Sequence, residues 1–557
     1  MAKIYINNPT KMIHYPKPGL SLSLFFSCVM TFSATAQKKF TLSGYVKSSS
    51  TGETSIGASI RVLPNGAGAA SNEYGFYSLT LPVNTYQLEI TAVGKRSDTV
   101  QVILDKDTRL NFLLDEEAKI LDDVIVKGVA RGGRTIAGTQ TGVERLTTRD
   151  IKNIPVLLGE RDVLKTIQLL PGIKSAGEGN AGFFVRGGSA DQNQILLDDA
   201  NVYNATHLLG FFSTFNSDAI KDVTVYKSGM PASYGGRLSS VLDIKMNDGN
   251  NQDYKVSGGI GLISAKLNVE GPIQKDKSSF LVTGRRTYAD VFLKASKDST
   301  INKSRLYFYD FNAKMNYEIG KKDRIYLSGY FGKDKLDFGG QFGVDWGNST
   351  GTLRWNRILS QKLFVNTSLI YSNYDYQITL KSGTNLFKVF SQIKDWNFKQ
   401  DYQLNAGTKN NIRFGWSTIS HAVRPGEVTA SEDSVKVDRL PQKRFSRESG
   451  LYATNTWKAS NKLNVTYGVR ISNFNVLGKG DFYTVNNEGT IIDTTSYKKG
   501  QTVKSYLNPE PRLAAGYQFD NNTSVKASYV RNVQYMHLIN NSSGGFSLLS
   551  GSAAASI

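Results

Sequence analysis

Long runs of alternating apolar and polar residues in the second half of the chain restrict its fold more than any other feature. From Tyr307 to Ile319 every second residue is apolar, and the residues between them are almost all polar. The run from Leu463 to Ser472 alternates in the same way. A tilted strand needs ~9–11 residues to cross a bilayer, whereas soluble strands average ~5–6. The pattern therefore predicts membrane-spanning β-strands with apolar side chains outward and polar side chains inward.

The connections between these runs alternate in length. We predict short turns at 320–323, 360–362, 407–410, 459–461 and 520–522. Longer polar stretches are expected at about 336–350, 424–446 and 476–507. Short periplasmic turns and long external loops are typical of outer-membrane barrels. A soluble β-protein such as a propeller is the alternative.

The number of predicted strands is small for a barrel of this kind. We count about twelve between Tyr254 and Tyr535, whereas the larger outer-membrane barrels have 16 to 22. The last residues, GGFSLLSGSAAASI, contain no closing alternating strand. We therefore expect residues 248–557 to form part of a transmembrane β-barrel, either as a fragment or as a natural truncation.

The N-terminus has the pattern of a secretory signal peptide. Three lysines precede an apolar stretch at 20–32, and Ala34-Thr35-Ala36 supplies a small-x-small cleavage pattern. We predict a signal peptide over 1–36, with cleavage between Ala36 and Gln37. A membrane anchor is the alternative, but the apolar core is shorter than the ~20 residues of a spanning helix.

Cysteine usage and charge exclude several classes of function. Cys28 is the single cysteine and lies within the predicted signal peptide, so the mature chain would have no disulfide and no thiol chemistry. The net charge of +20 is compatible with nucleic-acid binding. Because the cations are scattered along an exported chain, we expect solvated strand ends and loops instead, and no nucleic-acid partner.

Residues 37–117 are predicted to form a small β-sandwich. Short alternating strands are expected at 40–46, 58–62, 75–79, 86–90 and 99–103. Residues 40–115 resemble the carboxypeptidase-regulatory-like domain. The resemblance is carried by the sequence SGYVKSSSTGETSIGASIRVL…SNEYGFYSLTLPVNTYQLEITAVG. That resemblance implies a transthyretin-like accessory sandwich without peptidase activity. The four histidines, at 14, 207, 421 and 537, lack metal-ligand spacing, so we expect no metal site and no cofactor.

Residues 140–247 carry a set of ordered motifs. An amphipathic helix is predicted over 161–170, ended by Pro171-Gly172. It is followed by FVRGG at 184–188, ILLDD at 195–199, IKDVTV at 220–225, and YGGR at 234–237 before VLDI at 241–244. This order resembles the plug domain of TonB-dependent outer-membrane receptors. The resemblance implies that the plug closes a surrounding barrel.

Six residues of these motifs are the candidate structural or gating residues. Paired glycines allow the positive φ of tight turns, and arginines can bridge the plug to the barrel wall through buried carboxylates such as those of the two aspartates. Holding the plug together is one interpretation and direct ligand contact is the other. The candidates are Arg186, Gly187, Gly188, Asp198, Asp199 and Arg237.

A short apolar segment precedes the plug. Asp123, Val124, Ile125 and Val126 belong to an isolated strand-like stretch in the 118–139 region. An interdomain linker with one edge strand is one interpretation. The other is a TonB box, which would add as a strand to the periplasmic protein TonB. Its position directly before a plug-like module favours the TonB box.

Taken together, the sequence predicts a mainly β, outer-membrane protein of Gram-negative bacteria with periplasmic N-terminal modules. The expected function is TonB-energised import of a bulky, scarce, unidentified external ligand, gated by the plug. A signalling receptor or a non-functional truncated remnant is the alternative. No enzyme is expected, since no nucleophile–base set or phosphate loop occurs. Partners would be TonB, outer-membrane lipid, the ligand and, as an open question, a surface lipoprotein.

Overall fold

The computed structural model describes residues 38–538 with internal gaps, and the short strand 555–556. The gaps are 65, 118–137, 148–149, 151–152, 154–159, 178–180, 433–434, 440–441, 487, 489 and 521–522. The predicted signal peptide, its cleavage site Ala36–Gln37 and the segment Asp123–Val126 lie outside the described residues. Residues from Lys39 onward form one structural unit. No described helix is long and apolar enough to cross a membrane.

The first module is the predicted two-sheet sandwich. One sheet consists of β1 (Lys39–Ser48), β4 (Phe76–Pro82), β7 (Thr108–Arg109) and β8 (Phe112–Leu114). The other has the order β3 (Gly68–Ala70), β2 (Ser59–Val62), β5 (Asn84–Thr91), β6 (Asp98–Leu104). Apolar side chains from both sheets form one buried core that includes Leu42, Val46, Ile60, Leu88 and Ile90. This is the ordinary arrangement of a soluble domain, because alternation turns the apolar face of each sheet inward.

The plug is a small α/β module with a five-stranded mixed sheet. Its order is β13 (Ala200–Asn201), β12 (Asn193–Leu197), β17 (Ser240–Met246), β16 (Ile220–Tyr226), β9 (Val143–Thr147). The predicted helix is α2 (Val163–Gln168), whose N-cap Asp162 accepts from two backbone N–H groups. The two-stranded sheets β10 (Ile173–Ser175)–β11 (Phe183–Val185) and β14 (Thr206–His207)–β15 (Phe212–Ser213) complete it.

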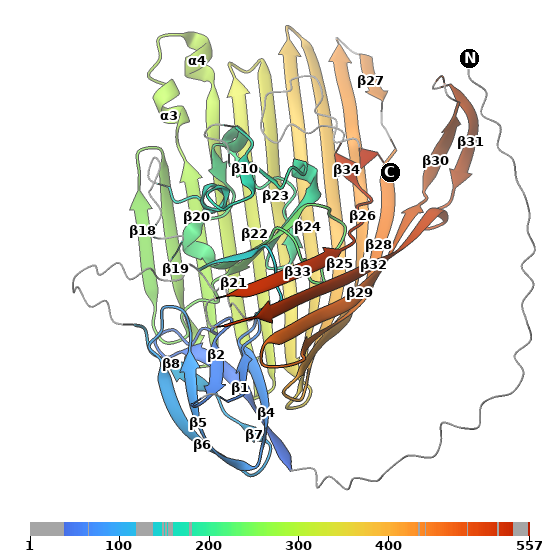
Figure 1. The fold of residues 1–557 in the computed structure, drawn as a ribbon. Helices are drawn as coiled ribbons and strands as arrows, with labels where there is room; N and C mark the ends of the chain where they lie inside the picture. The colour runs from blue at the N-terminus through green and yellow to red at the C-terminus, as the bar shows by residue number, and fades with distance from the viewer. Residues whose placement is uncertain are drawn as a thin grey trace, which may run out of the picture. The chain divides into compact units, whose positions relative to one another are not determined.

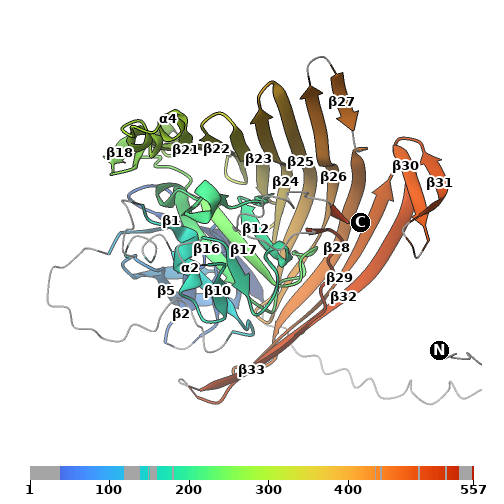
Figure 2. The same ribbon diagram turned by 90° about the horizontal axis from the view of Figure 1, so that it is seen from above.

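The third module is a single large antiparallel sheet, which Figure 2 shows curving around the plug. Thirteen strands follow one another in it, and β27 (Val435–Arg439) pairs with β26. The thirteen are β18 (Lys255–Ile260), β19 (Ser264–Gln274), β20 (Ser278–Thr287), β21 (Arg305–Ile319), β22 (Asp323–Phe338), β23 (Phe342–Ile358), β24 (Leu363–Ser382), β25 (Asn385–Ala406), β26 (Asn410–Glu432), β28 (Arg444–Lys458), β29 (Leu463–Leu477), β32 (Thr502–Gln518) and β33 (Ser524–Val530). The count is close to the predicted twelve. We call this sheet the barrel wall.

Smaller elements decorate the barrel wall. Two short helices, α3 (Asp290–Leu293) and α4 (Ser299–Lys303), connect β20 to β21. The hairpin β30 (Gly480–Val485)–β31 (Ile491–Tyr497) lies between β29 and β32, and β34 (His537–Leu538) pairs with β35 (Ala555–Ser556). The sandwich lies at the end of the wall where the short turns are (Figure 1), since Ser78 Oγ donates to the backbone oxygen of Gln361 in the β23–β24 turn.

The predicted alternation of the wall strands is confirmed, with the polar side buried. On β21, Asp310, Asn312 and Lys314 are at most 5% exposed, whereas Phe311 and Met315 are 47% and 46% exposed. The buried side faces the plug, and the exposed side carries aromatic and aliphatic groups along the whole wall. A soluble protein shows the opposite arrangement. Polar-in and apolar-out is what a strand between a filled lumen and lipid requires.

The predicted short turns at 320–323, 360–362, 407–410 and 459–461 are confirmed, and most of the turn at 520–522 lies outside the described residues. The predicted long loops are wrong in detail. At 336–350 the chain is strand almost throughout: β22 runs to Phe338, β23 begins at Phe342, and Gly339 and Gly340 form the turn with φ of 57° and 75°. The stretches 424–446 and 476–507 likewise contain the end of β26 with β27, and the β30–β31 hairpin. The polar composition did not end the strands, because cross-strand pairing kept the backbone extended.

Candidate functional site: the plug–barrel interface

The two aspartates of the ILLDD motif form the tip of a tight hairpin. Leu197 pairs with Ala200, so Asp198 and Asp199 are the two loop residues between β12 and β13. Both have positive φ, 47° and 73°. A two-residue loop with two left-handed residues is a type I′ turn, which Asp tolerates better than most side chains. The turn thus presents two adjacent carboxylates at the edge of the plug.

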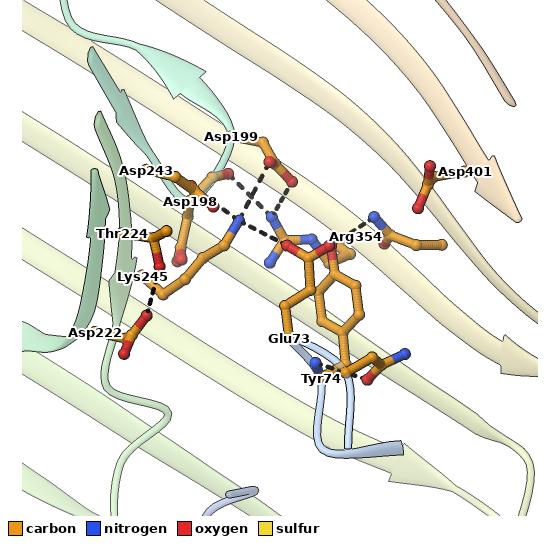
Figure 3. A network of polar contacts seen from close by, with 12 residues as sticks. Glu73, Tyr74, Asp198, Asp199, Asp222, Thr224, Asp243, Lys245, Arg354 and Asp401 are labelled. Atoms are coloured by element: carbon orange, nitrogen blue, oxygen red, sulfur yellow. Dashed lines mark hydrogen bonds and ion pairs between the residues drawn. The ribbon is translucent and has the colours of Figure 1, made fainter. Parts of the chain in front are cut away.

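Cations from the barrel wall meet these carboxylates. Lys314 Nζ on β21 lies 3.1 Å from Asp198 Oδ2, and Arg354 Nη2 on β23 lies 2.6 Å from Asp199 Oδ2. Lys245 on plug strand β17 contacts Asp199 Oδ1 at 3.2 Å and Asp243 Oδ1 at 3.2 Å. Figure 3 shows Lys245 pointing into this group, which we call the Asp198–Asp199 cluster. All these side chains are buried, so the cluster is an ionic joint between plug and wall.

Burial and neighbouring charges set the protonation of the plug groups. Burial alone would raise the pKa of Asp199, but Lys245, Lys399 and Arg354 hold it well below its usual range. Burial raises the pKa of Asp243 to about 6, with Asp199 adding to the rise and Lys245 opposing it. The carboxylates outweigh burial at Lys245 and raise its pKa. Removing one partner of such a pair leaves the other charge buried and uncompensated, which costs about 3–5 kcal/mol.

The interior of the cluster has room for a water molecule and little else. A cavity of about 20 Å³ lies between its side chains, bordered by Asp198, Lys245 and Lys314. A buried water needs about 10–15 Å³ by this kind of measure. No group of three His, Asp or Glu residues within the described part of the chain could hold a metal ion. The cluster is therefore suited to holding two protein surfaces together.

A second ionic joint contains a histidine. His207 Nδ1 on β14 lies 2.6 Å from Asp334 Oδ2 on β22, and its ring stacks on Phe308 with 4.0 Å between centroids. The backbone N–H of Leu208 donates to the other oxygen of Asp334 at 2.8 Å. Burial lowers the pKa of His207, but Asp334 and Asp310 outweigh it and raise the pKa above its usual value. The imidazole thus ties the plug to the wall here, and the raised pKa favours its charged form.

The arginines of the motifs do not make the pairing expected for them. Arg186 is an exposed residue with φ of 50°, in a turn with Gly187 at φ 80° and Gly188. Arg237 is half-buried and donates to the backbone oxygen of Gly236 at 2.8 Å. The expected partners, Asp198 and Asp199, instead pair with Lys245 and with wall cations, because the hairpin tip faces the wall.

None of the cations of the cluster was among the residues predicted from the sequence, and the part played by the sandwich was not predicted either. Lys245, Lys314 and Arg354 come from three separate strands, and Glu73 and Tyr74 come from the sandwich. The alternation of β21 already placed Lys314 on the inward face, so a charged residue at an inward position was an available signal. The sandwich residues carried no such signal, because they occupy a loop.

The curved wall, the plug on its polar side and the ionic joints between them define a plugged outer-membrane barrel. Comparison of the sequence with family profiles agrees. The TonB-dependent Receptor Plug Domain matches residues 133–240, the TonB dependent receptor-like β-barrel matches 275–547, and a CarboxypepD_reg-like domain matches 42–126. The two receptor profiles together cover more than half of the chain. This chain belongs to the TonB-dependent receptor family.

Solved structures show the same fold at low sequence identity. The copper transporter OprC is 12% identical with a TM-score of 0.51, covering 69% of this chain and 61% of its own. The Escherichia coli ferric-catecholate import receptor Fiu in its open form is 12% identical with a TM-score of 0.50, covering 72% and 70%. The Serratia marcescens hemophore receptor HasR is 10% identical with a TM-score of 0.52, covering 71% and 63%. The chain spans about three fifths of OprC. The comparison with curated proteins gave no match.

Proposed function

We propose that this protein serves in TonB-energised import of a scarce, bulky ligand across the outer membrane, with the plug as the gate. The observation that carries the proposal is the buried ionic contact between plug and wall. The polar face of the wall is covered by the plug rather than left as an open channel. A passage for a bulky solute therefore requires the plug to move or to rearrange.

The two ionic joints make the closed state stable without making it permanent. Salt bridges and hydrogen bonds lose their strength once water reaches them, because the dielectric constant rises. Water would not weaken an apolar plug–wall interface in this way, because apolar side chains do not exchange their contacts for hydrogen bonds to water. A gate that must open under force and close again is better served by contacts that water can replace.

The segment Asp123–Val126 is the proposed attachment point for TonB, and its position in the chain suits that role. It lies between β8, the last strand of the sandwich, and β9, an edge strand of the plug sheet. Strand addition of the segment to TonB would give a grip through backbone hydrogen bonds. Force applied there would reach β9, which pairs with β16 over residues 143–147.

The coupling is tested with a peptide of residues 118–130 and the periplasmic domain of TonB from the same bacterium, by isothermal titration calorimetry. The peptide should bind, the Ile125→Val peptide should bind within a few-fold, and Ile125→Pro should not bind. Proline removes a backbone donor that strand addition needs. Equal binding of the proline and valine peptides, or no binding by any, would refute TonB coupling.

Transport itself is tested in cells grown in a defined medium. Cells with the protein should deplete a solute that cells lacking it leave behind, as followed by mass spectrometry. Deletion of 121–127 should abolish this depletion while surface binding of the same solute persists. A matched deletion of 129–135 is the control. Unchanged depletion after deletion of 121–127 would refute the coupling role, and no depletion by cells with the unaltered protein would favour the signalling or remnant alternative.

A further inference from the structure

The sandwich is more than a neighbour of the plug, since one of its turns enters the plug–wall interface. The turn 72–76 connects β3 to β4 and carries Glu73 and Tyr74. Glu73 Oε1 lies 2.6 Å from Arg413 Nη2 on wall strand β26, and its other oxygen lies 3.5 Å from Lys245 Nζ in the plug. One carboxylate of the sandwich therefore contacts both other modules. Figure 3 shows Glu73 and Tyr74 beside Lys245 and Arg354.

The same turn is anchored to the wall by aromatic packing. Tyr74 and Phe76 stack on Phe364 of β24, with 5.6 and 5.2 Å between ring centroids. The hydroxyl of Tyr74 accepts from Asn366 Nδ2 at 2.7 Å. Arg354, which holds Asp199 of the plug, lies over the Tyr74 ring at 5.3 Å. The turn is thus packed against the wall while its charged side chain reaches the plug.

A second set of contacts joins the sandwich to the plug and to the residues that link the plug to the wall. Glu53 accepts from the backbone N–H groups of Asp248 and Gly249 at 2.5 and 3.2 Å, just after β17. The backbone oxygen of Ile56 accepts from Arg145 Nη2 at 3.2 Å. Arg145 lies on β9, the plug strand that follows the proposed TonB-binding segment. The sandwich therefore holds the strand on which an applied force would first act.

Electrostatics make the Glu73 contact a strong one. Burial would raise the pKa of Glu73, but Arg413 and Lys245 lower it to about 2. The side chain is therefore charged at any physiological pH. Its removal would leave Arg413 with Asp401 and Lys245 with Asp199 and Asp243, so both cations keep a partner while the link between modules is lost.

We propose that the sandwich is a latch for the plug, and that its turn 72–76 must leave the interface before the plug can leave the wall. Residues 118–137 connect the latch to the gate, so one pull on that segment loads both modules. The latch keeps the plug seated until a force reaches the sandwich. This inference rests on the proposed function only for the source of the force.

The latch is tested by pulling on the protein in a lipid bilayer, with no TonB and no ligand. Because Cys28 is the only cysteine of the chain, the double change Cys28→Ser and Ala130→Cys gives a unique attachment point in the connecting segment. At constant force, Glu73→Gln should shorten the lifetime of the seated plug by roughly tenfold or more, as expected for loss of a hydrogen bond between charged groups. Glu89→Gln makes the same chemical change in the exposed sandwich pair with Arg61 and should leave the lifetime unchanged.

A cross-link makes the test independent of any change at Glu73. Ser78→Cys with Gln361→Cys, joined by a short reducible thiol cross-linker, would fix the sandwich to the wall. The plug should then stay seated at forces that release it in the unmodified protein, and a reductant should restore release. Thr41→Cys with Thr80→Cys, paired across β1 and β4 inside the sandwich, is the control and should have no effect.

Two outcomes would overturn the latch. Equal lifetimes for Glu73→Gln and Glu89→Gln would show that the shared carboxylate does not restrain the plug. Release of the plug at the usual force while the sandwich stays cross-linked would show that the turn need not withdraw. Neither result depends on the TonB peptide titration, so the latch and the import proposal can fail separately.

Discussion

The sandwich and the barrel wall use the same alternating strand pattern with opposite orientation. On β5 of the sandwich, Leu88 and Ile90 are at most 1% exposed. On β21 of the wall, it is Asn312 and Lys314 that are buried, whereas the apolar Phe311 is exposed. One module therefore has an apolar core and a wet surface, and the other has a polar inner face and an apolar outer face.

The difference shows that an alternating pattern predicts a strand but does not say which of its faces is buried. Two further properties determine which face is buried. The wall strands β21–β26 have 15 to 23 residues, against 4 to 10 for β1, β2 and β4–β6. The inward face of the wall also carries charges that meet opposite charges of the plug, so burial there is supported by ion pairs rather than by apolar contact. The next predictions test this contrast.

The largest effect is expected where a buried charge of the wall is removed. Lys314→Met leaves Asp198 and Asp248 without their wall cation, since both lie within 3.1 Å of Lys314 Nζ. Breaking a buried pair on one side costs about 3–5 kcal/mol. The loss should appear as lowered stability in urea unfolding of the protein in lipid. Arg61→Met, in the exposed sandwich pair with Glu89, should cost less than about 1 kcal/mol. Equal losses of stability for Lys314→Met and Arg61→Met would contradict the difference between the wall and the sandwich.

A charge on the outer face should be costly only in the wall. Phe311→Lys places an ammonium group on the lipid-facing side of β21, which costs about 3 kcal/mol near the middle of a bilayer. Ile103→Lys makes a similar change on an exposed apolar position of β6 in the sandwich, and should be almost neutral. Refolding into vesicles, followed by urea titration, measures both. A neutral Phe311→Lys would mean that this face does not contact lipid.

Deleting an apolar side chain should have the reverse dependence. Leu88→Ala empties part of the sandwich core and should cost about 3 kcal/mol, including the cavity left behind. Leu327→Ala on β22 removes an outward, 47% exposed side chain and leaves no cavity, because lipid fills the space, so about 1 kcal/mol is expected. Thermal or urea unfolding of each variant shows the difference. Similar losses of stability at both positions would contradict the claim that the outer face of the wall contacts lipid.

Much of the fold was predictable because periodicity and turn chemistry are local properties. The alternation of β21 and β29, the helix around Leu164, and the short turns all followed from neighbouring residues. The stretch 336–350 was misjudged because its polar composition was taken to mean a loop, although pairing with adjacent strands extends it. Strand ends depend on such partners, which lie elsewhere in the sequence.

The candidate site was only half predictable for the same reason. The Asp198–Asp199 turn was found because the motif is contiguous. Its partners Lys245 and Arg354 lie 46 and 155 positions away, and no local pattern joins them. Glu73 was harder still to predict. It contacts Lys245 and Arg413 only when the sandwich is docked onto the plug and the wall.

The smallest effect concerns pH, and it separates the plug interface from the sandwich surface. Burial raises the pKa of Asp243 to about 6 from an ordinary 3.8, so the folded protein binds a proton between these values that the unfolded chain has released. By linkage, this group makes stability fall as pH rises from about 4 to about 6. Asp243→Asn should flatten that part of the curve, by about 2 kcal/mol across the window. Glu73 acts in the opposite sense and lower, because its pKa of about 2 means that its contribution is lost as pH falls below 4.5. Because the pKa values of His207 and Asp222 in the plug are also raised, it is the difference between wild type and Asp243→Asn from pH 4.5 to 7 that reports on Asp243, with Asp115→Asn on the exposed sandwich surface as the control. Parallel curves for wild type and Asp243→Asn would mean that the carboxylate of Asp243 titrates normally, and that the plug interface is as wet as the sandwich surface.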